Sequence, residues 1–252
     1  MARYLLMTGY LILTFLVVAV AAAAVVMPAR DWRTASRQPV GLAPDPATNP
    51  EPIVQIYAAR AIGWRGWFGV HTWVAVKPAG QGYIVYEVIG WRLYSSDSAL
   101  VARSRAPDGR WFGAMPELIA ERRGASAAGL IARIEQAARA YPWSGEYRIW
   151  PGPNSNTFTA WVLRAVPELE ADLPPTAIGK DYSGGRIIGS APSGNGFQLS
   201  LLGMLGLTAS GVEGLEVNVL GLTFGVHPFD PALKLPIVGR LGPARAFAPK
   251  QH

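Results

Sequence analysis

Alternating apolar and polar positions in the first half of the chain predict a set of β-strands. We expect strands over residues 53–58, 69–77 and 83–91. The segment 78–82, with its proline and two glycines, supplies a turn between the second and third strands. These strands therefore predict a hairpin within an antiparallel sheet.

The second of these strands has two faces of different character. Because side chains alternate along a strand, Val70, Thr72, Val74 and Val76 share one face, and His71, Trp73 and Ala75 share the other. The valine-rich face belongs in the core. We therefore expect His71 on the opposite face, where a cleft or a second layer could receive it.

The middle of the chain changes to a helical period. Apolar residues spaced for one helix face predict a helix over 125–141, which ends before Pro142. A short strand is expected at 147–150. Asn154 or Ser155 can cap a second helix that runs to about Val166.

The remainder of the chain is rich in glycine. From 183 to 239 glycine recurs every few residues between short aliphatic stretches, which predicts short strands joined by turns. We expect a small β region over 183–252, either an appendage or a surface that meets the membrane. The proline- and alanine-rich segment 31–52 has no period and is expected to be a linker to a main domain over 53–182.

The N-terminus contains an unusually long apolar run. Tyr4 to Met27 carries no charge and is long enough to cross a hydrocarbon core of ~30 Å. We expect an uncleaved signal anchor over 1–30, with the alanine-rich end as an alternative cleavage site. This predicts a single-pass membrane protein with a cytoplasmic N-terminus and an exported main domain.

Composition narrows the chemistry further. The chain has no cysteine, which excludes disulfides, thiolate metal sites and a cysteine nucleophile. Its net charge is +6, but the basic residues form no dense stripe, so we expect no nucleic-acid partner. The three histidines lack the spacing of metal ligands, so we expect no metal site. The sequence contains no glycine-rich nucleotide-binding loop, so we expect no cofactor.

His71 and Ser155 are the leading chemical candidates. A base on a strand and a hydroxyl at a helix start can build an acyl-transfer site, because helix-start N–H groups stabilise developing negative charge. Each residue also has a structural interpretation: His71 as a hydrogen-bonding partner and Ser155 as part of a helix cap. Glu87, on the neighbouring strand, could orient His71; otherwise it is an exposed edge charge or forms an ion pair with Arg92.

Two other polar residues are weaker candidates. Asp181 could join the site or cap a turn. His227 lies beside a proline, which favours a loop, and no partner residues for a metal accompany it.

Two groups of motifs resemble known families. His71-Thr72-Trp73, followed by Asn154-Ser155-Asn156-Thr157-Phe158, resembles the circularly permuted papain-like superfamily, which includes NlpC/P60 proteins and the lecithin:retinol acyltransferase group. The segments H-T-W-V-A-V-K-P, P-D-G-R-W, W-P-G-P-N-S-N-T-F and L-P-P-T-A-I-G-K-D-Y more closely resemble the DUF3750 proteins, an uncharacterised bacterial family. This resemblance implies that the anchor lies in the bacterial inner membrane and the main domain in the periplasm.

The papain-like resemblance implies a fold and a set of roles. The fold would be α+β, a permuted papain-like domain with an antiparallel sheet. His71 matches the base of that superfamily, and Ser155 stands where its cysteine nucleophile would be. Residues around them would contact the substrate, namely Trp67, Trp73, Asn154 and Asn156.

Two functions remain open. One is a membrane-anchored hydrolase or acyltransferase that acts on an amide or ester of cell-wall peptide or lipid, with Ser155, His71 and Glu87 as its catalytic residues. The other is an inactive binding or scaffold module, because a serine hydroxyl is a weak nucleophile until a base takes its proton.

Overall fold

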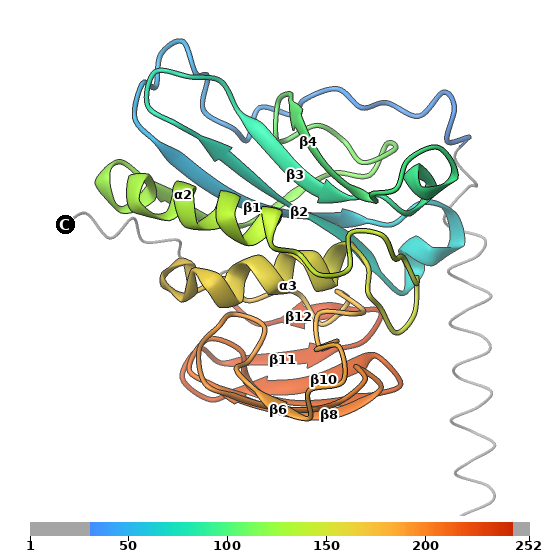
Figure 1. Ribbon diagram of the computed structural model, residues 1–252. Coiled ribbons are helices and arrows are strands. Elements are labelled where there is room, and N and C mark those ends of the chain that lie inside the picture. The colour runs from blue at the N-terminus through green and yellow to red at the C-terminus, as the bar shows by residue number, and fades with distance from the viewer. Residues whose placement is uncertain (1–30, 244–252) are drawn as a thin grey trace, which may run out of the picture.

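The computed structural model describes residues 31–243, which form three layers (Figure 1). A five-stranded sheet makes the first layer, two α-helices make the second, and a seven-stranded sheet makes the third. Both sheets are antiparallel. The expected α+β class with antiparallel sheets is therefore confirmed.

The first sheet carries the candidate histidine. Its strand order is β4-β3-β2-β1-β5, and its members are β1 (Ile53–Arg60), β2 (Val70–Lys77), β3 (Ile84–Val88), β4 (Leu100–Ser104) and β5 (Glu117–Arg123). The third strand is shorter than the pattern predicts, because the chain turns into the 3₁₀-helix η2 (Gly90–Tyr94). In the register of the central pair, His71 lies opposite Ala59.

Both faces of this sheet are packed. The valine-rich face of β2 lies in the main core with residues of both α-helices, among them Ile134 and Phe158. The opposite face packs a second cluster, in which Trp73 stacks on Tyr57 with ring centroids 5.6 Å apart. Loop residues such as Ala114 cover that cluster. His71 is thus placed on the face opposite the valines, as the alternation predicts.

The helices form where the apolar spacing predicts them. Helix α2 (Ala125–Arg139) buries Leu130 and Ile134, and α3 (Ser155–Ala165) packs against β2 and β3. Two further 3₁₀-helices are η1 (Gly63–Trp67) and η3 (Pro167–Leu169). The prediction of a strand at 147–150 is wrong: this segment is irregular, because its backbone bonds Pro153 and Asn154 instead of a neighbouring strand.

The glycine-rich region forms the second sheet, as one continuous meander. Its strands follow chain order as β6 (Ile188–Gly189), β7 (Phe197–Leu201), β8 (Leu205–Ser210), β9 (Gly214–Val219), β10 (Leu222–His227), β11 (Ala232–Leu235) and β12 (Gly239–Leu241). The positive φ of Gly221 (+79°) allows the tight turn between β9 and β10. Short strands joined by such turns are what the recurring glycines predict.

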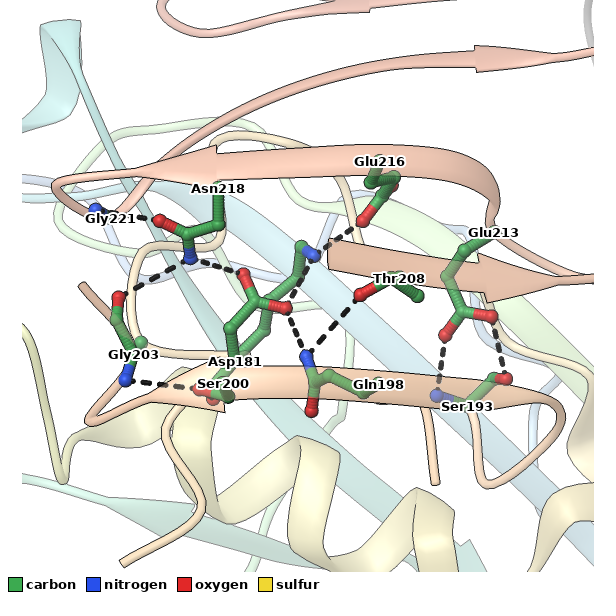
Figure 2. Close-up of polar contacts among 12 residues, drawn as sticks. Asp181, Ser193, Gln198, Ser200, Gly203, Thr208, Glu213, Glu216, Asn218 and Gly221 are labelled. Atoms are coloured by element: carbon green, nitrogen blue, oxygen red, sulfur yellow. Dashed lines mark hydrogen bonds and ion pairs between the residues drawn. The ribbon is translucent and has the colours of Figure 1, made fainter. Parts of the chain in front are cut away.

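The second sheet meets the helical layer through buried polar groups (Figure 2). Asp181 accepts hydrogen bonds from Gln198 (2.6 Å) and Asn218 (2.7 Å), and Lys180 Nζ lies 3.0 Å from the same carboxylate. Glu216 is bracketed by Lys180 and Lys234, each at 2.7 Å. Burial alone would lower the pKa of Lys180, but Asp181 and Glu216 outweigh it and raise that pKa. The inner face of this sheet is therefore fixed by specific charge pairs.

The segment ahead of β1 is irregular but is held against the domain. Backbone N–H groups of Leu42 and Ala43 donate to Asp108, the former at 2.7 Å. Between residues 31 and 243, no helix is long and apolar enough to cross a membrane. The predicted signal anchor over 1–30 lies outside the described residues.

Candidate functional site

A cleft opens at one end of the first sheet, where β2 begins and β3 ends. Its volume is about 850 Å³, and its walls come from η1, η2, the segment 147–150 and the start of α3. Aromatic rings dominate the lining, together with two arginines: Trp64, Phe68, Trp91, Tyr94, Trp111, Trp150, Arg65 and Arg148. Both His71 and Ser155 line this cleft.

The start of α3 is fixed by a capping box. Asn154 is the N-cap residue: its side-chain oxygen accepts from the N–H groups of Asn156 (2.9 Å) and Thr157 (3.2 Å). The Thr157 hydroxyl accepts from the Asn154 N–H in return. Gly179 (φ +96°) packs directly against the Asn154 amide, where any Cβ would collide with it. Ser155 is consequently the first residue of the helix, with its position set from both sides.

Hydrogen bonds tie this helix start to the residues on either side of His71. The Asn156 amide donates to the carbonyl of Val70 at 3.0 Å. Thr72 Oγ1 lies 3.0 Å from Asn156 Oδ1 and 2.8 Å from Thr159 Oγ1. Because the neighbours of His71 and of Ser155 are bonded to one another, the relative positions of the two candidates are held rigidly.

His71 contacts the carboxylate that the sequence suggests as its partner. The Nε2 atom of His71 lies 3.3 Å from Oε2 of Glu87, and both side chains are buried. Glu87 Oε1 also lies 3.4 Å from the guanidinium of Arg105. The alternative partner, Arg92, does not make this contact; Arg105 takes its place.

Trp111 covers the other side of the histidine. Its ring stacks on the imidazole with centroids 3.7 Å apart and planes 11° from parallel. Burial lowers the pKa of His71, and although Glu87 raises it, burial wins. The imidazole is therefore neutral at neutral pH, which is the form that can accept a proton.

Glu87 is held in its ionised form. Burial would raise its pKa, but the hydrogen bond from His71 and the charge of Arg105 outweigh burial, so the pKa falls below its usual range. An ionised Glu87 accepts the Nε2–H of a neutral His71. This leaves Nδ1 as the proton acceptor of the ring.

Ser155 shares the cleft with His71, but within residues 31–243 no hydrogen bond joins their side chains. Of the first three N–H groups of α3, those of Asn156 and Thr157 are taken by Asn154. The N–H of Ser155 makes no hydrogen bond in the described part of the chain. One backbone donor is thus left beside the Ser155 hydroxyl.

Of the four residues expected to contact substrate, two line the cleft and two do not. Asn154 and Asn156 line the cleft, but the amide of each is occupied by backbone partners, including the Ile178 carbonyl. Trp73 is fully buried in the second cluster, where its Nε1 donates to the Pro107 carbonyl. Neither Trp73 nor Trp67 is among the residues that line the cleft.

The two weaker candidates are structural. Asp181 lies in the polar interface between α3 and the second sheet. His227 ends β10 instead of lying in a loop, and its Nε2 contacts the carbonyls of Gly211 and Val212 while Nδ1 accepts from the Asp230 N–H. Among the described residues, no group of three or more acidic, histidine or cysteine side chains could hold a metal ion.

Sequence reasoning missed Trp111 and Arg105 as parts of the site. Both flank the turn at 107–110, which the sequence does predict, and Trp111 is the last residue of the P-D-G-R-W motif. The turn is tied to the segment ahead of β1 by Asp108, which accepts hydrogen bonds from the N–H groups of Leu42 and Ala43. The P-D-G-R-W motif singles out Trp111, but the sequence alone does not show that its ring lies against His71.

The residues of the cleft lie within a segment that matches a known protein family. The model of the DUF3750 family, described as proteins of unknown function, matches residues 51–182. The chain belongs to the DUF3750 family. Every residue of the cleft lies inside the part of the chain that the DUF3750 model matches, whereas the second sheet lies beyond it. No curated protein and no solved structure matches the chain.

Proposed function

We propose that this DUF3750 protein is a membrane-anchored envelope hydrolase or acyltransferase with a papain-like arrangement of its site. The observation that carries the proposal is the shared cleft: a buried, neutral His71 backed by an ionised Glu87, together with Ser155 at a helix start. Such a base, orienting acid and nucleophile form the constellation that activates a hydroxyl for acyl transfer. The anchor is the charge-free run at the N-terminus.

Each of these groups has a separate role in the proposed reaction. The Ser155 hydroxyl attacks the carbonyl carbon of an amide or ester while Nδ1 of His71 takes its proton. Glu87 stabilises the resulting imidazolium through Nε2. The N–H of Ser155 donates to the oxyanion, with help from the dipole of α3.

Collapse of the tetrahedral intermediate completes the step. The carbon–leaving-group bond breaks, and the leaving amine or alcohol takes the proton from His71. The acyl group stays on Ser155 until water, or another hydroxyl or amine, accepts it. Water gives hydrolysis, and the other acceptors give acyl transfer.

The cleft supports a substrate with apolar or ring-bearing groups and an anionic part. Trp64, Trp91 and Trp150 offer flat surfaces, while Arg65 and Arg148 supply positive charge at the walls. Cell-wall peptides and lipids of the envelope both combine these features. Trp64 and Trp91 replace Trp67 and Trp73 as the proposed contacts.

A second candidate is a binding or scaffold module that keeps the cleft without the chemistry. Two observations favour it: serine stands where a papain-like enzyme has cysteine, and Ser155 makes no hydrogen bond to His71 among the described residues. A hydroxyl far less acidic than a thiol depends entirely on its base. Without a hydrogen bond to its base, Ser155 would leave the cleft as a binding site alone.

Labelling with a fluorophosphonate probe separates the two. The probe should modify the wild-type chain at Ser155, as located by peptide mass spectrometry, and should not modify the Ser155→Ala variant. Ser126→Ala, in the first turn of α2 and outside the cleft, should label like the wild type. Equal labelling of wild type and Ser155→Ala would leave the binding module as the better account.

A further inference from the structure

The second sheet has its polar side chains inside and its apolar side chains outside. On β9, Glu216 and Asn218 are buried, whereas Leu215, Val217 and Val219 are 55%, 43% and 42% exposed. A sheet that covers a soluble domain shows the opposite alternation. The alternation in the sequence of β9 thus places its apolar side chains on the outer face of the sheet.

The same inversion runs across the sheet. In strands β7 to β11 the charged residues are Glu216 and Lys234, and both are buried on the inner face. The outer face is built from exposed aliphatic and aromatic side chains, among them Phe197, Leu205, Leu207, Phe224, Val226 and Leu233. Soluble monomers rarely expose a continuous apolar patch above a few hundred Å², and larger ones mark interaction surfaces.

The sheet cannot bury this face by turning over. Its inner face holds Glu216 between Lys180 and Lys234, and Lys234 also lies 2.7 Å from Asp172. Exchanging the faces would leave Lys180 and Asp172 buried without Glu216 and Lys234, at a cost of several kcal/mol for each buried ion. The outward orientation of the apolar face is therefore locked.

We propose that this outer face docks onto the apolar layer of a lipid bilayer. The charge-free run Tyr4–Met27 is long enough to cross a bilayer and would hold the domain beside one. Seven strands about 4.8 Å apart make a face roughly 30 Å wide, whereas one helix is only about 10–12 Å across. A bilayer can cover the whole face, and the chain's own N-terminal run cannot.

The shape and charge of the face also suit lipid. It contains a hollow of about 690 Å³, lined by residues such as Leu207, Val217 and Phe224, which would admit acyl chains. Because the open sheet edges keep unpaired backbone groups, the sheet would lie on the bilayer surface and would not cross it. The face itself carries no exposed charge in strands β7 to β11, as contact with the apolar layer requires, because Glu216 and Lys234 are both buried.

One hydrogen bond connects the second sheet to the cleft. The carbonyl of Leu220, in the turn between β9 and β10, accepts a hydrogen bond from Nε1 of Trp150 at 2.8 Å. Trp150 also lines the cleft. The β9–β10 turn of the docking sheet and one wall of the cleft are thus joined by this contact, whether or not Ser155 performs chemistry.

Single-cysteine labelling of the full-length chain tests this docking. The chain has no cysteine, so Val217→Cys and Leu207→Cys each offer one site for the environment-sensitive fluorophore NBD. Arg139→Cys, on the exposed side of α2, is the matched control. Each protein is mixed with phosphatidylethanolamine–phosphatidylglycerol vesicles that carry a doxyl quencher near the head of the acyl chain.

We expect NBD at 217 and 207 to shift to the blue and to lose at least half of its emission to the quencher, while NBD at 139 does neither. Failure to bind the vesicles, or equal quenching at all three sites, would overturn the proposal. So would a blue shift without quenching. In that case, a blue shift that depends on the density of protein on the vesicles would indicate that a second copy covers the face. A blue shift that does not depend on protein density would indicate that the N-terminal run covers it.

Discussion

The Nε2 atom of His71 lies 3.3 Å from the Oε2 atom of Glu87, inside a buried pocket capped by the ring of Trp111. The carboxylate accepts the Nε2–H, so Nδ1 of a neutral imidazole is left as the proton acceptor of the ring. The two neighbours contribute in opposite directions: burial lowers the pKa of His71 and Glu87 raises it. Their balance sets the pH range in which the site can act.

Glu87→Gln should lower the pKa of His71 further, because a neutral amide neither attracts the imidazolium nor accepts from it as a carboxylate does. The rate of fluorophosphonate labelling at Ser155 falls when His71 is protonated. We therefore expect the acid limb of the rate–pH profile to move to lower pH. Its plateau should fall by about 100-fold or more, because without the carboxylate His71 is no longer held in the tautomer that acts as the base.

Glu135→Gln is the control for that measurement, because it neutralises a carboxylate paired on the surface of α2 with Arg139. Its profile should overlay that of the wild type. An unchanged profile in Glu87→Gln would show that the carboxylate does not act on His71.

Trp111→Ala should have the opposite effect on the pKa of His71. Removing the stacked ring lets water reach the imidazole, and the burial that lowers its pKa is relieved. The acid limb should move up, toward or above pH 6.5, while Trp111→Phe should leave it near its wild-type position. A limb that stays in place in Trp111→Ala would mean that the ring does not set the pKa.

Asn156→Ala should destabilise the fold, because it leaves the carbonyl of Val70 without its side-chain donor. It also removes one of the two amide donors to the Ile178 carbonyl and a partner of Thr72. Unsatisfied buried groups of this kind cost about 1–3 kcal/mol each. Urea unfolding should show a loss of at least that size. Asn49→Ala, at an exposed turn with local bonds, should change the free energy of unfolding by less than about 0.5 kcal/mol.

Lys234→Met should weaken the attachment of the second sheet. The substitution keeps much of the side-chain volume but leaves Glu216 and Asp172 buried with one fewer cation. Breaking a buried pair in this way costs about 3–5 kcal/mol. Thermal unfolding should report the loss, and a change of less than about 1 kcal/mol would show that the charge pairs do not hold the sheet.

The sequence predicts the centre of the first sheet better than its edges. Strands β1, β2 and β3 have alternating or continuous apolar residues and lie within one or two residues of the expected starts. The strands β4 and β5 lie at the two edges of the sheet and carry charged residues, for instance Arg103 and Glu121. Charges protect an edge from pairing with other chains, and they also remove the alternation by which a strand is recognised.

The pairing of His71 with Glu87 could be anticipated because both residues follow from local strand patterns. The stacking of Trp111 on His71 could not, because it depends on how a turn distant in sequence folds over the sheet. The cleft walls likewise come from 3₁₀ turns and an irregular segment at 147–150, which have no periodic signal. The alternation along the strands of the second sheet shows that one face is apolar and the other polar. It does not show which face is buried, because that depends on the charge pairs with Lys180 and Asp172.

The most direct test of the site uses a thiol in place of the Ser155 hydroxyl. Ser155→Cys would be the only cysteine of the chain, and His71 together with the start of α3 should lower its pKa below the ordinary value of about 8.5. The rate of alkylation by iodoacetamide as a function of pH measures that pKa. Ser126→Cys, also in the first turn of a helix but outside the cleft, reports the helix alone.

We predict that the midpoint for Ser155→Cys lies at least one pH unit below that for Ser126→Cys, and that adding His71→Asn abolishes most of this difference. A midpoint for Ser155→Cys that is the same with and without His71 would contradict the account, because it would show that His71 does not act on residue 155.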